Sequence, residues 1–341
     1  MLSGEQYHAL HQGAGLVDRS GRGRLRLTGS DRKDYLQGLL TNDIAALSAG
    51  TGCYAALLTA QGRMIADMYL VETGDAIVMD LECDVTAKVF AHLDRFVITE
   101  DVQIADETET VAQIGVFGPN APAVLTEVLE LDRAWLDSSA LFENRGSVWQ
   151  ASPVLVARRD DVGVAGFDLL IAINAGDALA DALRQAGAVD VDPDVVDVSR
   201  VEAGRPIFGR DMTEDTIPLE AGIEGRAISF TKGCYVGQEI IIRVMHRGHG
   251  RVARRLVGLT FDSSSPVPAA GSRIRSGERE LGAVTSAVRS EALGAPIAMG
   301  YVQRDFTEPG TEVSVVSGDT PAAATVVALP FTSASRAVPS A

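Results

Sequence analysis

The sequence predicts an α+β protein that ends in a small β-barrel. Strand-like and helical patterns mix between residues 22 and 186 without a regular βαβ rhythm, which favours an α+β fold over a doubly wound sheet. From residue 251 onward, short strand patterns separated by Gly, Pro and Ser are typical of a small barrel. A length of 341 residues exceeds one ordinary core, so we expect two or three domains.

The first third of the chain predicts an antiparallel meander flanked by two helices. Strand segments alternate polar and apolar side chains, and helical segments place apolar side chains on one face. The predicted elements are a strand at 22–28, a helix capped by Ser30 or Asp31, strands at 53–59, 63–72 and from 76, and a helix at 84–96 capped by Asp84.

The rest of the chain repeats the same signals and then changes to strands alone. The middle predicts strands at 113–118, 153–159 and 166–173 and helices at about 120–130 and 176–186. The predicted barrel strands are 254–261, 271–276, 281–290, 297–302, 311–316 and 322–331.

Composition limits the classes of function. A net charge of −16 argues against a protein that coats nucleic acid or anionic membrane over its whole surface. Three cysteines without a Cys-x-x-Cys pair argue against a disulfide framework or a complete metal cluster, which favours a reducing, cytoplasmic compartment. The N-terminus lacks a signal peptide pattern, and the most apolar stretch is too short to span a membrane. We expect a monomer.

The stretch SFTKGCYVGQEII, residues 229–241, places a cysteine between two glycines. Val236, Ile240 and Val244 recur at helical spacing, so Cys234 is expected at or just before a helix N-terminus. Free backbone N–H groups and the Lys232 ammonium would both favour the Cys234 thiolate. The alternative is a small apolar residue buried under the helix.

The segment KGCYVGQE resembles the signature of the YgfZ-type folate-binding proteins, which are relatives of the glycine cleavage aminomethyltransferase, the T-protein. Further matches cover nearly the whole chain. They are LQGLLTND (36–43), GRMIADMYLVE (62–72), RVEAGRPIFGRDMTEDTIPLEAG (200–222) and the barrel segment GAVTSA (282–287).

This resemblance implies a T-protein-like ring of three domains around a tetrahydrofolate pocket. Two interleaved α+β subdomains would occupy residues 1–250, a barrel 251–335 and a tail 336–341. The implied function is support of iron–sulfur cluster assembly or repair, including the iron–sulfur enzymes that modify tRNA. The implied partners are folate and the iron–sulfur assembly machinery or its client enzymes.

The alternative is a folate-dependent aminomethyltransferase. The transferase has a Gly-Gly-x-x-Asp-Asp type strand where this chain reads GRMIAD, so Arg63 and Ala66 depart from the pattern and Asp67 survives. A carboxylate is the group that handles a proton on a pterin nitrogen. The transferase also has a Tyr-Thr-Gly-Glu run where this chain reads VGVAGFD (162–168), and it lacks a cysteine at the place of Cys234. Both of these departures favour the assembly-factor branch.

Eight residues are candidates for the site. Glu202 could accept hydrogen bonds from a pterin's amino and ring N–H groups, although a solvated loop acid is the alternative. Asp67 could equally be a strand-edge residue. The predicted catalytic residues are Cys234 and Asp67, and the predicted cofactor-binding residues are Glu202, Tyr54, Asn42, Lys232, Gln238 and Arg243.

The basic run from Arg243 to Arg255 is a further candidate site. It holds five arginines and no acid, so it could anchor the glutamate tail of folate or make a local tRNA contact, or be a solvated face. His246 and His249 lack a third ligand nearby, so no metal site is expected.

Overall fold

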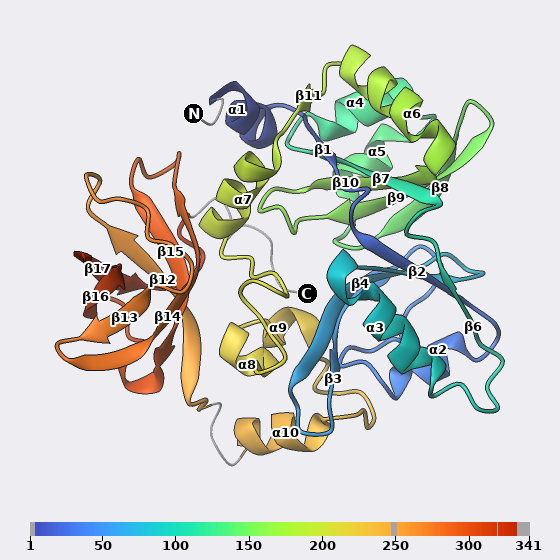
Figure 1. Ribbon diagram of the computed structural model, residues 1–341. Coiled ribbons are helices and arrows are strands. Elements are labelled where there is room, and N and C mark those ends of the chain that lie inside the picture. Colours follow the sequence, from blue (N-terminus) through green and yellow to red (C-terminus); the bar gives the residue numbers. More distant parts are fainter. Residues whose placement is uncertain (1–3, 247–250, 319, 333–341) are drawn as a thin grey trace.

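The computed structural model describes residues 4–246, 251–318 and 320–332. Figure 1 shows a barrel on the left and two α+β bodies on the right, one above the other, with helices α7, α8 and α9 running between them. Each body is built around its own sheet.

The upper α+β body holds a six-stranded sheet. Its strand order is β11-β1-β7-β10-β9-β8, and β1 pairs parallel with β11 while the other neighbours are antiparallel. The strands are β1 (Gly15–Asp18), β7 (Val111–Phe117), β8 (Asn144–Trp149), β9 (Ser152–Arg159), β10 (Gly166–Ala172) and β11 (Val189–Asp190). The helices are α4 (Ala121–Val128), α5 (Arg133–Ser138) and α6 (Ile173–Gln185).

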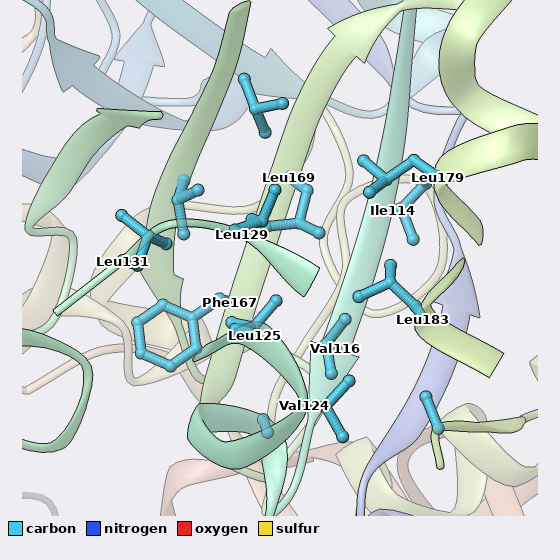
Figure 2. Packing of buried hydrophobic residues seen from close by; sticks show 14 of the residues in the cluster. Ile114, Val116, Val124, Leu125, Leu129, Leu131, Phe167, Leu169, Leu179 and Leu183 are labelled. Carbon is cyan, nitrogen blue, oxygen red and sulfur yellow. The ribbon is translucent and has the colours of Figure 1, made fainter. Parts of the chain in front are cut away.

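Period-two alternation explains which face of this sheet is apolar. Phe167 and Leu169 on β10 point into the core beside Val116 on β7, while Asp168 between them faces the other way. Figure 2 shows these side chains packed with Leu125 of α4 and with apolar side chains of α6. One face is thus apolar under the helices, and the opposite face carries polar groups together with smaller apolar clusters.

The lower α+β body holds a five-stranded sheet in the order β3-β4-β5-β2-β6. The chain enters it after β1 and returns to the upper body at β7, so the two bodies interleave along the sequence as predicted. Its elements are β2 (Gly23–Thr28), α2 (Arg32–Gln37), β3 (Gly52–Leu58), β4 (Met64–Glu72), β5 (Ile77–Leu81), α3 (Cys83–Asp94) and β6 (Gln103–Asp106).

Several helix boundaries differ from the predicted ones, and α3 is an example. The helix expected over 84–96 is α3, which begins one residue earlier, and its N-cap is Glu82, not Asp84. Asp31 is the N-cap of α2, but its side chain makes no capping hydrogen bond.

The C-terminal strands close into a six-stranded barrel, which confirms the α+β-plus-barrel prediction. The order is β12-β15-β14-β13-β16-β17. The elements are β12 (Arg254–Phe261), β13 (Arg273–Ser276), β14 (Arg279–Arg289), β15 (Pro296–Gln303), the 3₁₀ turn η1 (Arg304–Phe306), β16 (Glu312–Ser317) and β17 (Thr320–Val327). The domain limits at 250 and 335 stay predictions, and the tail at 336–341 lies outside the described residues.

Helices join the three bodies. They are α1 (Gly4–Gln12), α7 (Pro193–Glu202), α8 (Pro218–Ala221), α9 (Glu224–Ala227) and α10 (Gln238–His246). Arg200 of α7 is buried and donates to Asp211, whose other carboxylate oxygen accepts hydrogen bonds from Thr285 and Ser286 of the barrel. This buried polar contact fixes the barrel against the α+β bodies.

The two sheets face each other through buried charges. Arg159 on β9 pairs with Asp168 on its own sheet and with Asp80 on the other sheet. Gln113 on β7 donates to both of these carboxylates, and its amide oxygen accepts from Arg24 on β2. Side chains from both sheets therefore satisfy one another where no water reaches them.

We predict that Arg159→Met destabilises the protein by about 3–5 kcal/mol, because it leaves several buried carboxylates without their shared cation. Urea unfolding measures this change. Arg133→Met is the matched control, because Arg133 makes a half-exposed pair with Asp137 worth about 0–1 kcal/mol. Equal losses in the two variants would contradict a structural role for the buried cluster.

Candidate functional site

A cavity of about 630 Å³ lies where the two α+β bodies meet the segment that contains α7. Its walls come from the β1–β2 connection, from β3 and β4, and from residues 190–210. Such a volume suits a small organic ligand. The cavity wall is mixed, with aromatic, acidic and arginine side chains together.

Tyr54 and Asp67 form a hydrogen-bonded pair in this cavity. They lie on the neighbouring antiparallel strands β3 and β4, and the Tyr54 hydroxyl donates to Asp67 Oδ2 at 2.5 Å. Tyr69 lies two residues beyond Asp67, so the same face of β4 carries both, and its ring stacks on Tyr54 with centroids 4.8 Å apart. Two predicted site residues are thus brought together in the cavity.

Burial raises the pKa of the Asp67 carboxyl group, which makes its carboxylate a stronger base. Removal of its carboxyl from water raises the pKa of Asp67 to about 6, and the hydrogen bond from Tyr54 opposes this shift. Burial, together with the neighbouring carboxylate, holds the pKa of Tyr54 well above its usual value, so Tyr54 stays a donor. A carboxylate that titrates near neutral pH can accept a proton from a bound ligand.

Arginines that the sequence did not single out complete the wall. Arg205 and Arg226 both line the cavity, and Asp160 accepts a hydrogen bond from each, at 2.6 and 2.5 Å. The guanidinium carbon of Arg226 lies 5.8 Å from the centre of the Tyr54 ring. No local sequence pattern identifies these arginines as cavity residues. Tyr69 could have been predicted to line the cavity, because it lies two residues after Asp67 on the same strand face.

Glu202 lies outside the cavity wall, so the structure does not place it at this ligand site. Its carboxylate is buried and accepts hydrogen bonds from the Tyr7 hydroxyl at 2.7 Å, the Ser290 hydroxyl at 2.6 Å and the Ala292 N–H at 3.1 Å. These donors come from α1 and the barrel. Glu202 therefore ties the barrel to the α+β bodies, and it is not a solvated loop acid either.

Asn42 and Lys232 also lie outside the cavity wall, yet they contact residues behind it. The Asn42 side-chain nitrogen donates to the carbonyl oxygens of Tyr54 and Arg226. The Lys232 ammonium donates to three carbonyl oxygens at the end of α2, and burial lowers the pKa of Lys232 to about 8. Lys232 is thus held by backbone.

Cys234 is exposed, which excludes the buried alternative, but it does not lie at a helix N-terminus. Helix α10 begins four residues later, at Gln238. Gly237 has a φ of +86°, and a Cβ there would lie 2.5 Å from the carbonyl oxygen of Thr59. The chain must therefore turn against the β3–β4 hairpin before the helix can start. Cys234 lies outside the cavity wall, so its reactivity stays a prediction.

Gln238 and Arg243 also lie outside the cavity wall, on α10. The Gln238 side chain donates to the Gly233 carbonyl oxygen at 3.5 Å, and Arg243 pairs with Glu239 at 2.5 Å. The basic run is partly neutralised because Arg254 pairs with Glu220 and Arg255 with Glu224. His249 and the rest of residues 247–250 lie outside the described residues.

The described residues include neither a cluster of metal-ligating side chains nor a membrane-spanning helix. There, no three His, Cys, Asp or Glu side chains gather closely enough to hold a metal ion. Over the same residues, no helix has the length and apolar character needed to cross a membrane.

The fold and the cavity define a class of protein that combines two interleaved α+β bodies, a barrel and a cavity of small-molecule size. Residues 2–232 match the model of the GCVT N-terminal domain, and residues 254–332 match the glycine cleavage T-protein C-terminal barrel domain. The chain belongs to this glycine cleavage T-protein family, which confirms the predicted T-protein-like fold. The narrower YgfZ-type assignment stays a prediction.

Two curated relatives and one solved structure are similar over most of the chain. The aminomethyltransferase of Cutibacterium acnes is 32% identical and covers 96% of this chain and 89% of its own. That of Streptomyces coelicolor is 31% identical, with 96% and 88% covered. The crystal structure of glycine cleavage system aminomethyltransferase T from Bartonella henselae has a TM-score of 0.85 at 25% identity and covers 96% and 89%.

We predict that the free energy of unfolding of Asp67→Asn, taken relative to that of the wild type, is higher at pH 7.5 than at pH 4. The folded-state pKa near 6 exceeds the unfolded value of 3.8, so folding binds a proton between these pH values and the Asp67 contribution to stability falls as pH rises. The full change is about 3 kcal/mol. Urea unfolding of both proteins at the two pH values measures it.

Asp75→Asn is the control with the opposite sign. The hydrogen bond from Thr73 lowers the pKa of Asp75, so the aspartate gains stability as pH rises and the variant should lose relative stability. A difference between Asp67→Asn and wild type that does not vary with pH would contradict the raised pKa.

Proposed function

We propose that the protein is a tetrahydrofolate-dependent transferase of an aminomethyl or related one-carbon group. The observation that carries this proposal is the Tyr54–Asp67 pair in the cavity, with the pKa of Asp67 raised toward neutrality. The shared fold and the relatives named aminomethyltransferase support it. They also favour this alternative over the iron–sulfur interpretation.

The cavity fits a folate in size and character. Its volume of about 630 Å³ is within the usual range for small-molecule sites, and the stacked rings of Tyr54 and Tyr69 give it an aromatic wall. Arg205 and Arg226 add hydrogen-bond donors for a ligand's acceptor atoms. Tetrahydrofolate, when bound, would supply the nitrogen that takes up the one-carbon unit.

The side chains of this protein would manage the proton. Asp67 would accept the proton that the ligand nitrogen loses when that nitrogen bonds to the transferred carbon, because a carboxylate with a pKa near 6 is mostly ionised at neutral pH. In the same transfer the bond between that carbon and its donor group breaks, and the donor group leaves with the electron pair of that bond. The hydrogen bond from Tyr54 occupies one oxygen of the Asp67 carboxylate. The same hydrogen bond fixes the direction in which the other oxygen points. Tyr69 packs against Tyr54 and limits the movement of its ring.

The two positions at which this strand departs from the transferase pattern, 63 and 66, support Asp67 as the proton acceptor on β4. Ala66 is fully buried in the apolar core, on the face of β4 opposite Asp67. Arg63 lies at the hairpin turn and pairs with Asp215. An acid at position 66 would therefore point away from the cavity, and the loss of that acid does not remove the proton acceptor.

We predict that Asp67→Asn lowers kcat by about 10²–10⁴-fold, because the amide cannot accept the proton. Release of ammonia from an aminomethylated lipoyl carrier in the presence of tetrahydrofolate measures this rate. Glu214→Gln is the control, since Glu214 is exposed and pairs with Lys88. An unchanged rate in Asp67→Asn, or no ammonia from wild-type protein, would contradict the proposal.

A second candidate is folate-dependent support of iron–sulfur enzymes. The observation that favours it is the exposed thiol of Cys234 within the KGCYVGQE segment. We predict that Cys234→Ser lowers the activity of iron–sulfur enzymes in cells by at least about tenfold, as loss of a nucleophile does. Cys83→Ser, which changes the other exposed cysteine, is the control. Equal enzyme activities in the two strains would exclude this role.

A further inference from the structure

The Lys232 ammonium holds together two segments that are distant in the sequence. Its nitrogen donates to the carbonyl oxygens of Gln37, Leu40 and Asn42 at 2.7, 2.7 and 2.8 Å. These carbonyls lie at the last residue of helix α2 and just after it, while Lys232 belongs to the loop that exposes Cys234. A half-buried ammonium with three acceptors has all its donors in use. The position of the loop therefore depends on the backbone of residues 37–42.

The same backbone supports the cavity from behind. Asn42 donates to the carbonyl oxygen of Tyr54 at 2.8 Å and to that of Arg226 at 3.1 Å, and both of these residues line the cavity. Asn42 thus accepts a hydrogen bond from the loop through its carbonyl and donates toward the cavity through its side chain.

Thr41 makes a parallel connection. Its buried hydroxyl donates to the Ala227 carbonyl oxygen at 2.6 Å and accepts from the Ala56 N–H at 2.8 Å. Its own carbonyl oxygen accepts from the Ser229 N–H at 3.1 Å. Residues 41–42 therefore contact β3, the end of α9 and the exposed loop at the same time.

We propose that Lys232 and Asn42 are positioning residues that couple the cavity to the exposed loop at residues 229–234. Ligand binding beside Tyr54 and Asp67 changes the accessibility of Cys234 through this relay, and changes at the loop alter ligand affinity by the same factor. The ligand part of this inference rests on the proposed folate site. Cys234 serves here as the reporter of the loop, whatever its own chemistry.

The physical reason is the cost of separating these contacts. Loss of the ammonium would leave three part-buried carbonyl oxygens without their donor, and leaving such groups unpaired is unfavourable. The backbone of residues 37–42 and the loop therefore move together. Asn42 also donates a hydrogen bond to the backbone of Tyr54. A ligand that shifts Tyr54 therefore also shifts Asn42 and the hydrogen bond that Asn42 accepts from Lys232.

Thiol labelling tests the relay. In a Cys83→Ser background, a maleimide reports Cys234, because Cys53 is buried. Saturating 5-formyltetrahydrofolate should change the labelling rate about fivefold in this background, at the lower end of typical coupling. Lys232→Met and Asn42→Ala should remove the ligand effect, and Lys232→Arg, which keeps a charged donor, should restore part of it.

Lys33→Met is the matched control. Lys33 lies on α2 and donates to a single carbonyl oxygen, that of Leu47, so its loss should leave the ligand effect intact. Melting temperatures identify any variant that fails to fold. A folded Lys232→Met protein whose labelling still responds to the folate as in the background protein would overturn the relay.

Hydrogen exchange without ligand separates this inference from the proposed function. Lys232→Met should speed exchange in peptides covering 39–44 and 52–58, while Lys33→Met should not. If calorimetry shows that the wild-type protein binds no folate, the proposed function fails and the exchange result alone judges the relay. Unchanged exchange at 52–58 in Lys232→Met would overturn it.

Discussion

The rest of the structure depends on how the two sheets pack through their polar faces. Each sheet covers one face with helices and apolar side chains, and the other face carries charges that must find partners beside a small apolar cluster that both sheets share. Arg159 and Asp80 come from different sheets and pair in a place that water does not reach. Such pairs contribute little net stability but are costly to break, so they fix the relative position of the bodies. The cavity lies beside this interface and takes its walls from both bodies.

Much of the fold was readable from local patterns. The meander, most helices and the barrel follow from alternation and helical spacing, because each element has one apolar face. Helix α10 shows where this argument ends. Its apolar spacing already appears at Val236, yet the helix starts at Gln238 because Gly237 must pack against Thr59 of a hairpin far away in the sequence. Contacts of that kind carry no local signal.

The candidate site divides in the same way. Asp67 could be predicted from the sequence because it is retained in a strand whose alternation places it on the face opposite Ala66. Tyr54 could be predicted with it because it lies on the strand predicted to be the neighbour. The position of Glu202 could not be predicted, because a carboxylate among small residues suits a ligand and a buried structural contact equally well. Only the position of Ser290, on the barrel, distinguishes them. Arg205 and Arg226 had no signal, since the acid that holds both lies far from them in the sequence.

The distribution of arginines explains why Asp67 can act as a base. An arginine paired directly with Asp67 would lower its pKa and weaken it as a proton acceptor. The nearby arginines have other partners, since Arg22 pairs with Asp80 and Glu82 and Arg226 with Asp160. Tyr54 is instead the side-chain donor that reaches Asp67, and a neutral phenol lowers a carboxyl pKa less than a cation does. Burial therefore outweighs the favourable contacts. Because other acids engage the nearby arginines, one carboxylate in the cavity stays basic enough to take a proton.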